Sequence, residues 1–255
     1  MKAKLLALLI LIMSSSLAVT AGLWGWADLN AQNAYFYMDK WQTAKHVGSL
    51  KEWRIAYQSM RQARKFNPYS VDYMITMGQL YEWSAALMAF PSDKQKSLNE
   101  AKKYYQLAAE NRPTWPHAWA NYAYVKTLLN ESDENLNIAI RKTLEYGPWI
   151  KEAQKKIMIV SLIEWDNLPL SLQALVKQSM QNWLGVKRKE MGRFIISKAV
   201  EMDRAYVVRA VLATIENKKT YEKFLDRLTK KKSAYCKESK CSSYPIKRFD
   251  ERFEV

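Results

Sequence analysis

The sequence predicts an all-α protein built from repeated pairs of helices, and three observations support this fold class. Seven glycines and seven prolines among 255 residues, with 49% hydrophobic content, favour a helical domain over a β-rich or disordered chain. No alternating apolar and polar period competes with the helical one. The third observation is a 12-residue interval that ends on proline three times, from Ala56 to Pro68, from Ala101 to Pro113 and from Leu136 to Pro148.

Small and large residues recur in register within these intervals. The positions eight and five residues before each proline are Met60 and Ala63, Tyr105 and Ala108, and Ile140 and Thr143. Ten residues after the first two prolines, Gly78 and Ala123 are small enough to let two helices approach closely. Small residues at fixed positions and a closing proline, in units of about 34 residues, form the tetratricopeptide pattern. We therefore expect a tetratricopeptide-like helical-repeat solenoid over residues 28–185.

The predicted units differ in length. Pro113 and Pro148 are 35 residues apart, whereas Pro68 and Pro113 are 45 residues apart, with the excess near Ala86 to Ser97. The fourth unit starts at Trp149 and is degenerate. Met158 replaces its small residue, and Leu184-Gly185 replaces its closing proline, as expected for a capping repeat.

The amino terminus predicts a membrane segment. Lys2 and Lys4 precede an uncharged run from Leu5 to Ala27, and these 23 residues cover roughly 30 Å at about 1.5 Å each. Trp24 and Trp26 lie at the far end of the run, where indoles favour the membrane interface. The positive-inside rule leaves the two lysines in the cytoplasm and exports the rest.

Residues 1–27 are thus interpreted as a membrane anchor. The alternative is a cleaved signal peptide, with Val19-Thr20-Ala21 as the small residues before Gly22. Either interpretation exports the remaining chain.

Residues 186–255 predict a basic helical extension with a cysteine-containing tail. They hold 19 basic and 10 acidic residues, a net charge of +9, against 19 and 15, or +4, for residues 28–185. The densest basic runs form a candidate basic patch of Lys187, Arg188, Lys189, Lys230, Lys231 and Lys232. Such a patch suits anionic lipid or an acidic polymer, or it is simply a solvated helix face. Because the domain is exported, nucleic acid is not an expected partner.

Cys236 and Cys241 are the only two cysteines. In an oxidising compartment with no other thiol available, they are expected to form a short structural disulfide.

No pattern for catalysis is apparent. His46 and His117 are the only histidines, and the sequence contains no nucleophile elbow, phosphate loop, zinc-protease motif or paired-cysteine metal signature. We therefore expect no catalytic residue, cofactor or metal ion, and a protein that is not an enzyme.

The first helix of each stacked pair faces the concave side of a solenoid, which predicts a binding groove. Counting from the prolines, its candidate residues are Asp72, Gln79, Glu82, Trp83, His117, Tyr124, Thr127 and Lys155. A polar lining with a few aromatic rings suits a protein segment or a carbohydrate. Trp115, Trp119 and Trp149 flank the proline turns and are expected to be buried between repeats.

A family resemblance rests on three stretches. They are Arg112-Pro113-Thr114-Trp115-Pro116-His117-Ala118-Trp119-Ala120-Asn121-Tyr122-Ala123-Tyr124-Val125-Lys126, Gly147-Pro148-Trp149 and Gly78-Gln79-Leu80-Tyr81-Glu82-Trp83. These resemble the VpsP family of proteins linked to exopolysaccharide biosynthesis. The resemblance covers most of residues 1–185 and not the basic tail. It implies an accessory role in making or exporting a bacterial surface polysaccharide, and no catalytic residues.

The leading functional hypothesis is a periplasmic-facing scaffold or adaptor that binds envelope polysaccharide-assembly proteins. The chain would be held in the bacterial inner membrane by a single pass, or would be soluble in the periplasm after signal cleavage. One alternative is a binding module for an anionic glycan, favoured by the basic tail. Another is an adaptor in a different envelope assembly system.

Overall fold

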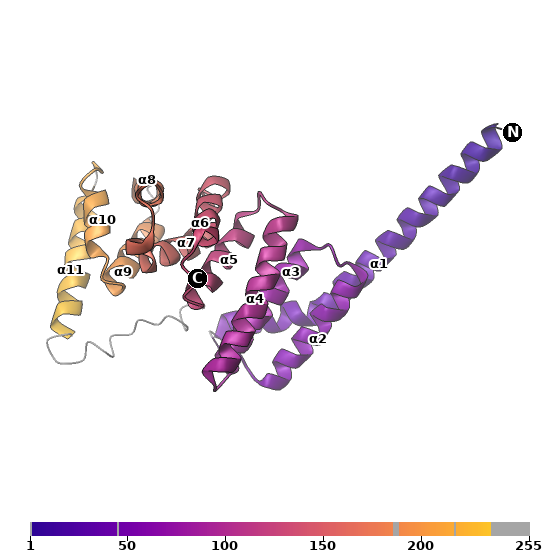
Figure 1. Ribbon diagram of the computed structural model, residues 1–255, viewed down its shortest axis with the longest axis horizontal. Coiled ribbons are helices and arrows are strands. Elements are labelled where there is room, and N and C mark those ends of the chain that lie inside the picture. The colour runs from indigo at the N-terminus through magenta and orange to yellow at the C-terminus, as the bar shows by residue number, and fades with distance from the viewer. Residues whose placement is uncertain (1, 45, 186–188, 217, 236–255) are drawn as a thin grey trace. The chain divides into compact units, whose positions relative to one another are not determined.

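The computed structural model describes residues 2–44, 46–185, 189–216 and 218–235. Every regular element in these ranges is a helix, which confirms the all-α prediction (Figure 1). The chain divides into two compact units between Tyr104 and Tyr105, inside helix α4. Unit 1 denotes the residues up to Tyr104, and unit 2 denotes the residues from Tyr105 onward.

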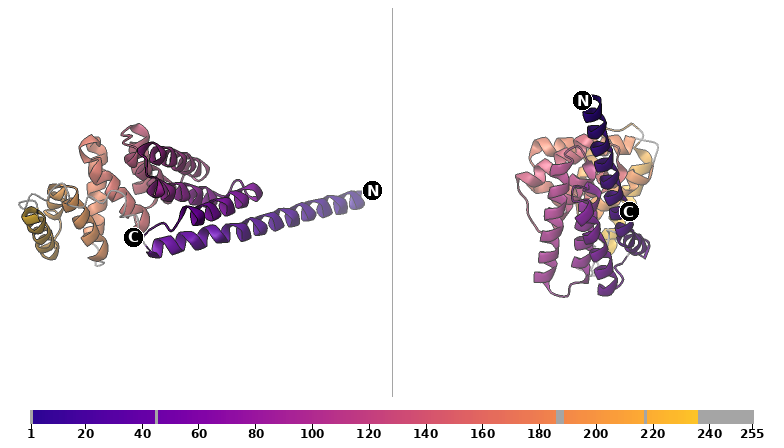
Figure 2. Two further views of the ribbon diagram at one scale, coloured as in Figure 1. Left: turned by 90° about the horizontal axis from the view of Figure 1, so that it is seen from below. Right: turned by 90° about the vertical axis from the view of Figure 1, so that its right-hand side faces the viewer.

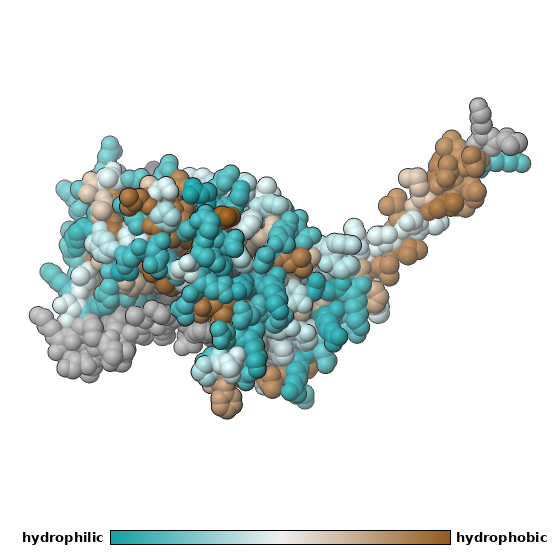
Figure 3. Space-filling view, in the orientation of Figure 1, coloured by the Kyte–Doolittle hydropathy of each residue, from teal (hydrophilic) through white to brown (hydrophobic). Residues whose placement is uncertain are grey.

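Helix α1 (Lys2–Ala44) is one uninterrupted helix with two different surfaces. Apolar side chains from Leu5 to Trp26 are exposed all round the helix, as Figure 3 shows at the right of the view. From Ala27 onward a stripe of small residues is buried, with Ala31 and Ala34 one and two turns further along. Among the described residues, α1 is the one helix long and apolar enough to cross a membrane. The change of surface coincides with the predicted end of the anchor.

Helix α2 (Leu50–Phe66) packs antiparallel to the second half of α1 (Figure 2). Near the start of α2, Glu52 accepts hydrogen bonds from Lys40 Nζ at 2.7 Å and from Trp41 Nε1 at 3.2 Å. Further along α2, Ser59 donates to the backbone oxygen of Asn30. The alanine stripe of α1 lets the α2 backbone approach closely because it places no bulky side chain between the helices.

Helix α3 (Val71–Leu87) runs parallel to the second half of α1. Its Tyr73 hydroxyl donates to Asp28, and its Trp83 ring lies 5.7 Å from the Trp41 ring. Burial and the hydrogen bond to Asp28 raise the pKa of Tyr73, so its hydroxyl stays protonated and remains a donor. The second half of α1, α2 and α3 therefore form one three-helix bundle.

Aromatic rings hold α4 (Pro91–Asn111) against this bundle through Tyr104. Trp53 stacks on Tyr57 at 5.1 Å, and Tyr81 stacks on Tyr104 at 5.7 Å. Tyr81 also donates to the Tyr57 hydroxyl at 3.2 Å, which links the two stacks. Unit 1 thus ends in a continuous aromatic contact.

The residues 12, eight and five positions before each of the three prolines are all core residues, and each of these nine is exposed by 1% or less. They are Ala56, Met60, Ala63, Ala101, Tyr105, Ala108, Leu136, Ile140 and Thr143. The predicted alternation of small and large side chains is therefore the buried stripe of α2, α4 and α6 (Glu134–Tyr146).

The three proline turns are built alike. Helices α2, α4 and α6 end two residues before their prolines, at Phe66, Asn111 and Tyr146. In each turn the next backbone N–H donates to the carbonyl five residues before the proline: Asn67 to Ala63 at 3.1 Å, Arg112 to Ala108 at 3.0 Å, and Gly147 to Thr143 at 3.0 Å. The prolines stop these helices as predicted, because proline lacks the N–H that would extend them.

The extra residues of the longer unit lengthen its helices. Helices α3 and α4 contain 17 and 21 residues, whereas α5 (Pro116–Leu128) and α6 contain 13 each. The excess is therefore about one additional turn on α3 and two on α4.

Unit 2 continues the pairing with α7 (Lys151–Ile163), a 3₁₀ turn (Trp165–Asn167), α8 (Leu170–Gly185), α9 (Lys189–Glu201), α10 (Ala205–Leu212) and α11 (Lys219–Tyr235). From α5 to α11, each helix contacts the next helix and the one after it. This is the contact pattern expected when helix pairs stack. The pattern continues past Gly185 without a change.

A buried lysine with two carboxylate partners fixes the α5–α6 connection. Lys126 is buried and donates to Glu131 at 2.9 Å and to Asp133 at 2.8 Å. Asp133 also caps α6 by accepting from the Leu136 N–H at 3.0 Å. Burial by itself would lower the pKa of Lys126, but the two carboxylates outweigh burial and raise it.

The predicted burial of the turn tryptophans holds only in part. Trp115 and Trp119 are half-buried, but the prediction was wrong for Trp149, which is 60% exposed. Its ring contacts the ring of Trp183 edge-on at a centroid distance of 5.6 Å.

Gly147 is the residue for which space is most restricted at a proline turn. A methyl group there would lie 2.6 Å from Cβ of Pro116, whose ring is buried and rigid. We predict that Gly147→Ala lowers the free energy of unfolding of the detergent-solubilised chain by about 1–3 kcal/mol. Guanidinium denaturation followed by far-ultraviolet circular dichroism measures the change.

The matched control is Gly185→Ala, where an added methyl group meets nothing within 4 Å. It should leave stability unchanged or raise it by up to about 1 kcal/mol, because alanine is the better helix former. Equal effects of the two substitutions would contradict the close approach of Gly147 and Pro116.

Candidate functional site

The candidate groove residues of unit 1 lie on α3, and two of the four are core residues. Asp72 is exposed and Gln79 is half-buried, whereas Glu82 and Trp83 are buried. The Trp83 ring packs on Trp41 of α1. The second half of α1 therefore contacts this part of the predicted groove surface.

The candidate groove residues of unit 2 lie on α5 and α7. Tyr124 is buried, and the Lys156 ammonium of α7 lies 5.4 Å from the centre of its ring. The same ammonium donates to Asn121 Oδ1. Thr127 is also buried and donates to the backbone oxygen of Ala123 at 3.2 Å. The two Lys156 contacts hold α5 against α7, whereas the Thr127 hydrogen bond lies within α5.

Lys155 faces the other neighbour, α9. Its ammonium lies 5.4 Å from the Phe194 ring centre and 3.9 Å from Glu190 Oε1, which Lys151 contacts at 2.7 Å. Burial lowers the pKa of Lys155, and repulsion from Lys151 lowers it further. The two ammonium groups in turn lower the pKa of Glu190. Lys155 is thus a buried cation that pairs across helices.

His117 is the groove candidate of unit 2 with the most accessible titratable group. It is half-buried at the start of α5, with its ring 5.8 Å from that of Trp115. Burial lowers its pKa; Glu152 opposes this shift, and Lys156 adds to it. The imidazole is therefore neutral at neutral pH and can accept or donate a hydrogen bond.

The helices α5, α7 and α9 therefore bring His117, Tyr124 and Lys155 to one row of interhelical contacts. Three further participants, Asn121, Lys156 and Glu190, were not predicted from the sequence. Asn121 lies one turn after His117, and this spacing could have identified it. Most of these side chains bond to one another, which leaves little of the row open to a ligand.

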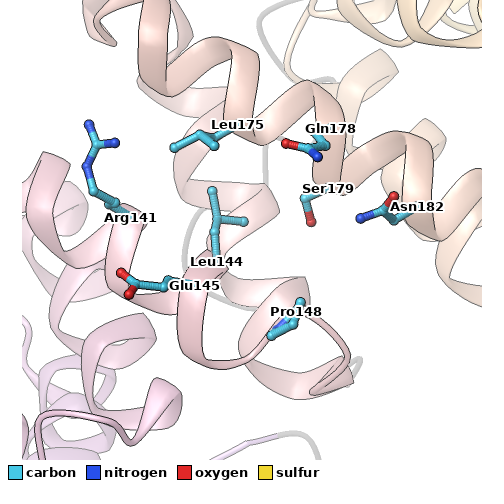
Figure 4. Close-up of a pocket in the computed structure, with 8 residues that line it drawn as sticks. All are labelled: Arg141, Leu144, Glu145, Pro148, Leu175, Gln178, Ser179 and Asn182. Atoms are coloured by element: carbon cyan, nitrogen blue, oxygen red, sulfur yellow. The ribbon is translucent and has the colours of Figure 1, made fainter.

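An open cavity lies instead between the second helices, α6 and α8 (Figure 4). We call it the α6–α8 cavity; its volume is about 460 Å³. It is lined by Arg141, Leu144, Glu145, Pro148, Leu175, Gln178, Ser179 and Asn182. The leucines and the proline form an apolar surface, and amide and charged groups surround it.

Hydrogen bonds fix one wall of this cavity. Ser179 donates to Gln154 Oε1 at 2.8 Å, and Gln154 Nε2 donates to the Gly147 oxygen at 2.8 Å. Ser179 and Gln154 are both buried, so this chain ties α8 to α7 and to the turn after α6. The cavity was not predicted from the sequence, although Gln178 and Asn182 share one face of α8 at a spacing of four residues.

The candidate basic patch is only partly described by the structure. Lys187 and Arg188 lie outside the described residues, as do Cys236 and Cys241 of the predicted disulfide. Lys189, Lys230 and Lys231 are exposed.

The predicted patch was wrong for Lys232, which is not exposed. It is buried and donates to the backbone oxygens of Val200 and Glu201 at 2.9 Å each. Its ammonium also lies 2.7 Å from Asp203 Oδ1. The inward face of α11 carries Lys232 back onto the end of α9.

The outward face of α11 carries an exposed basic stripe, defined as Lys219, Lys223, Arg227 and Lys230. These residues follow one another at intervals of four, four and three, which places them on one helix face. In the part of the chain that the structure describes, no group of three His, Cys, Asp or Glu side chains could hold a metal ion.

We predict that Lys156→Gln raises the pKa of His117, because the substitution removes a cation that disfavours the imidazolium. Glu152→Gln should lower the same pKa, because it removes the opposing carboxylate. Proton NMR titration of the ring measures both shifts, and His46→Gln assigns the signals since the chain has two histidines. Shifts of the same sign would contradict this arrangement.

No protein-family model matches the chain, and no curated protein matches its sequence. The resemblance around Trp115 thus stays a prediction. What the chain does is inferred from the surfaces that its two units present.

Proposed function

We propose that this chain is a non-catalytic, membrane-anchored adaptor that binds a segment of a partner protein in bacterial exopolysaccharide or capsule biosynthesis or export. The observation that carries the proposal is the α6–α8 cavity. It is preformed, it is open to solvent, and it lies between two packed helices whose separation is fixed by buried hydrogen bonds.

The chemistry of the cavity suits a peptide segment. Leu144, Leu175 and Pro148 offer an apolar surface for one or two partner side chains, and a volume of about 460 Å³ lies in the usual range for binding sites. The amides of Gln178 and Asn182 can pair with backbone groups of an extended chain.

The anchoring part of the proposal is supported by α1. Its exposed apolar half gains free energy by leaving water, and at about 25 cal/mol per Å² such a surface strongly favours lipid. With α1 uncleaved, the positive-inside rule supports a single-pass inner-membrane protein whose two units face the periplasm. The resemblance to the VpsP family supports exopolysaccharide assembly as the process, and the thin inventory of nucleophiles and acid–base pairs supports a non-catalytic role.

The test is affinity capture of the intact, detergent-extracted chain from its own envelope. We predict that Asn182→Arg reduces recovery of the partner to background, because the longer side chain fills the cavity. Asn135→Arg is the matched control, since Asn135 is exposed on α6 outside the cavity. It should capture as much partner as the unaltered chain.

Recovery of polysaccharide polymerase or export components by the unaltered chain and the control, but not by Asn182→Arg, supports the proposal. Equal capture by all three chains would reject the α6–α8 cavity as the binding surface. Recovery of components of a different envelope system would support the adaptor role but reject exopolysaccharide or capsule assembly as the process.

A second candidate function, binding of an anionic glycan, is favoured by the basic stripe of α11. Four exposed cations on one helix face attract an acidic polymer over about 8–10 Å at moderate salt. The stripe is a better target than the Lys230–Lys232 run, because reversing the buried Lys232 would disrupt its contacts with Val200, Glu201 and Asp203.

If this candidate holds, Lys223→Glu with Lys230→Glu weakens binding to soluble polygalacturonate by roughly tenfold or more, at about 1 kcal/mol for each basic charge lost near an anionic surface. The salt dependence of binding should also become shallower. Lys51→Glu with Arg54→Glu removes the same charge from exposed positions of α2 and serves as the control. Equal losses of binding in the two double variants would show that binding depends on net charge alone and not on the basic stripe.

A further inference from the structure

The turn between α2 and α3, residues Asn67–Ser70, lies at the end of the unit 1 bundle nearest the exposed apolar half of α1. Two contacts fix the direction of α2. Glu52 is hydrogen-bonded to Trp41, and Ser59 to Asn30, so the α2 chain runs toward the amino terminus of α1. Two more fix α3, because Tyr73 meets Asp28 and Trp83 meets Trp41.

The level of this turn along α1 follows from the helix rise. Phe66 ends α2 seven residues after Ser59, which is about 10 Å at 1.5 Å per residue. The same distance from Asn30 toward the amino terminus of α1 ends near Leu23. The turn is therefore level with Trp24 and Trp26, the exposed indoles at the end of the apolar run.

The side chains at this level suit the boundary between lipid and water. Tyr69, in the turn, is 81% exposed, the most exposed tyrosine among the exposed large hydrophobic residues. Lys65 and Arg61 lie one turn apart on the exposed side of α2. Tyrosine rings prefer the headgroup region, and long basic side chains reach phosphate oxygens while their methylene stems lie on apolar surface.

Charge at this end is balanced rather than strongly basic. Asp28 and Asp72 are exposed there as well, and Asp28 accepts the Tyr73 hydroxyl. The match is therefore to phospholipid phosphates in general, and does not depend on a net anionic membrane.

We infer that the α2–α3 turn is a second membrane contact, in which Tyr69 and Lys65 lie among the phospholipid headgroups of the bilayer that α1 crosses. This inference rests on the anchoring part of the proposed function. The contact fixes the orientation of unit 1 on the membrane, which a single helix crossing leaves free to rotate and tilt.

The test uses the full chain in phosphatidylcholine vesicles, with Cys236→Ser and Cys241→Ser removing the native thiols. Tyr69→Cys carries an environment-sensitive fluorophore, and one tenth of the lipid carries a headgroup nitroxide as quencher. The label at position 69 should lose more than half of its emission. Phe90→Cys is the matched control, because Phe90 is 67% exposed and lies beyond the far end of α3, about 25 Å away. Its label should keep its emission.

Charge reversal separates contact from mere proximity. Arg61→Glu with Lys65→Glu should reduce the quenching at position 69 by about half or more, because carboxylates repel the phosphates. Lys51→Glu with Arg54→Glu, at the opposite end of α2, should leave it unchanged.

Flotation of the same vesicles separates the two levels of the proposal. A chain that floats with lipid while position 69 is no more quenched than position 90 overturns the second contact and leaves the anchor intact. A chain that does not float overturns the anchor and the second contact together.

Discussion

Unit 1 depends on a single helix, α1, that passes without a break from an apolar environment into a protein bundle. The residues of α1 up to Trp26 suit lipid or an equivalent apolar environment, and the residues from Ala27 onward pack against protein. The backbone hydrogen bonds of the helix continue through this change. The alanine stripe makes this change possible, because Ala27, Ala31 and Ala34 let α2 approach closely. The contacts of Glu52 with Lys40 and Trp41, and the hydrogen bond from Ser59 to Asn30, use that close approach.

The sequence predicted the helices well where a repeated pattern coincided with the core. Met60, Tyr105 and Ile140 are buried at matching positions because the helical period and the closing proline impose the same spacing on each helix. The first helix pair was harder to recognise. The predicted anchor ends at residue 27, whereas the same helix continues to Ala44 and supplies the partner of α2. No proline lies at that boundary, and Gly22 and Gly25 just before it do not interrupt the helix, so composition alone could not reveal the change of role.

The candidate site was less predictable, because exposure depends on neighbouring helices. Tyr124 and Lys155 lie where the helical count places them, but partners on α7 and α9 cover them. Lys232 belongs to a basic run yet points inward, since the carbonyls that end α9 are within its reach. The α6–α8 cavity arises from the packing of two helices that are about thirty residues apart in sequence, and no local pattern encodes such a space.

Because α1 contains no linker, the rotation and height of the unit 1 bundle are fixed relative to the apolar half of the helix. A helix advances about 100° and 1.5 Å with each residue, so one residue inserted before Ala27 would swing the whole bundle about the α1 axis by more than a quarter of a turn. Four inserted residues would nearly restore the angle and lift the bundle by about 6 Å. The length of the apolar half therefore sets how far unit 1 stands from the middle of the bilayer, and its helical phase sets the direction in which the bundle projects from the α1 axis relative to the residues inside the membrane.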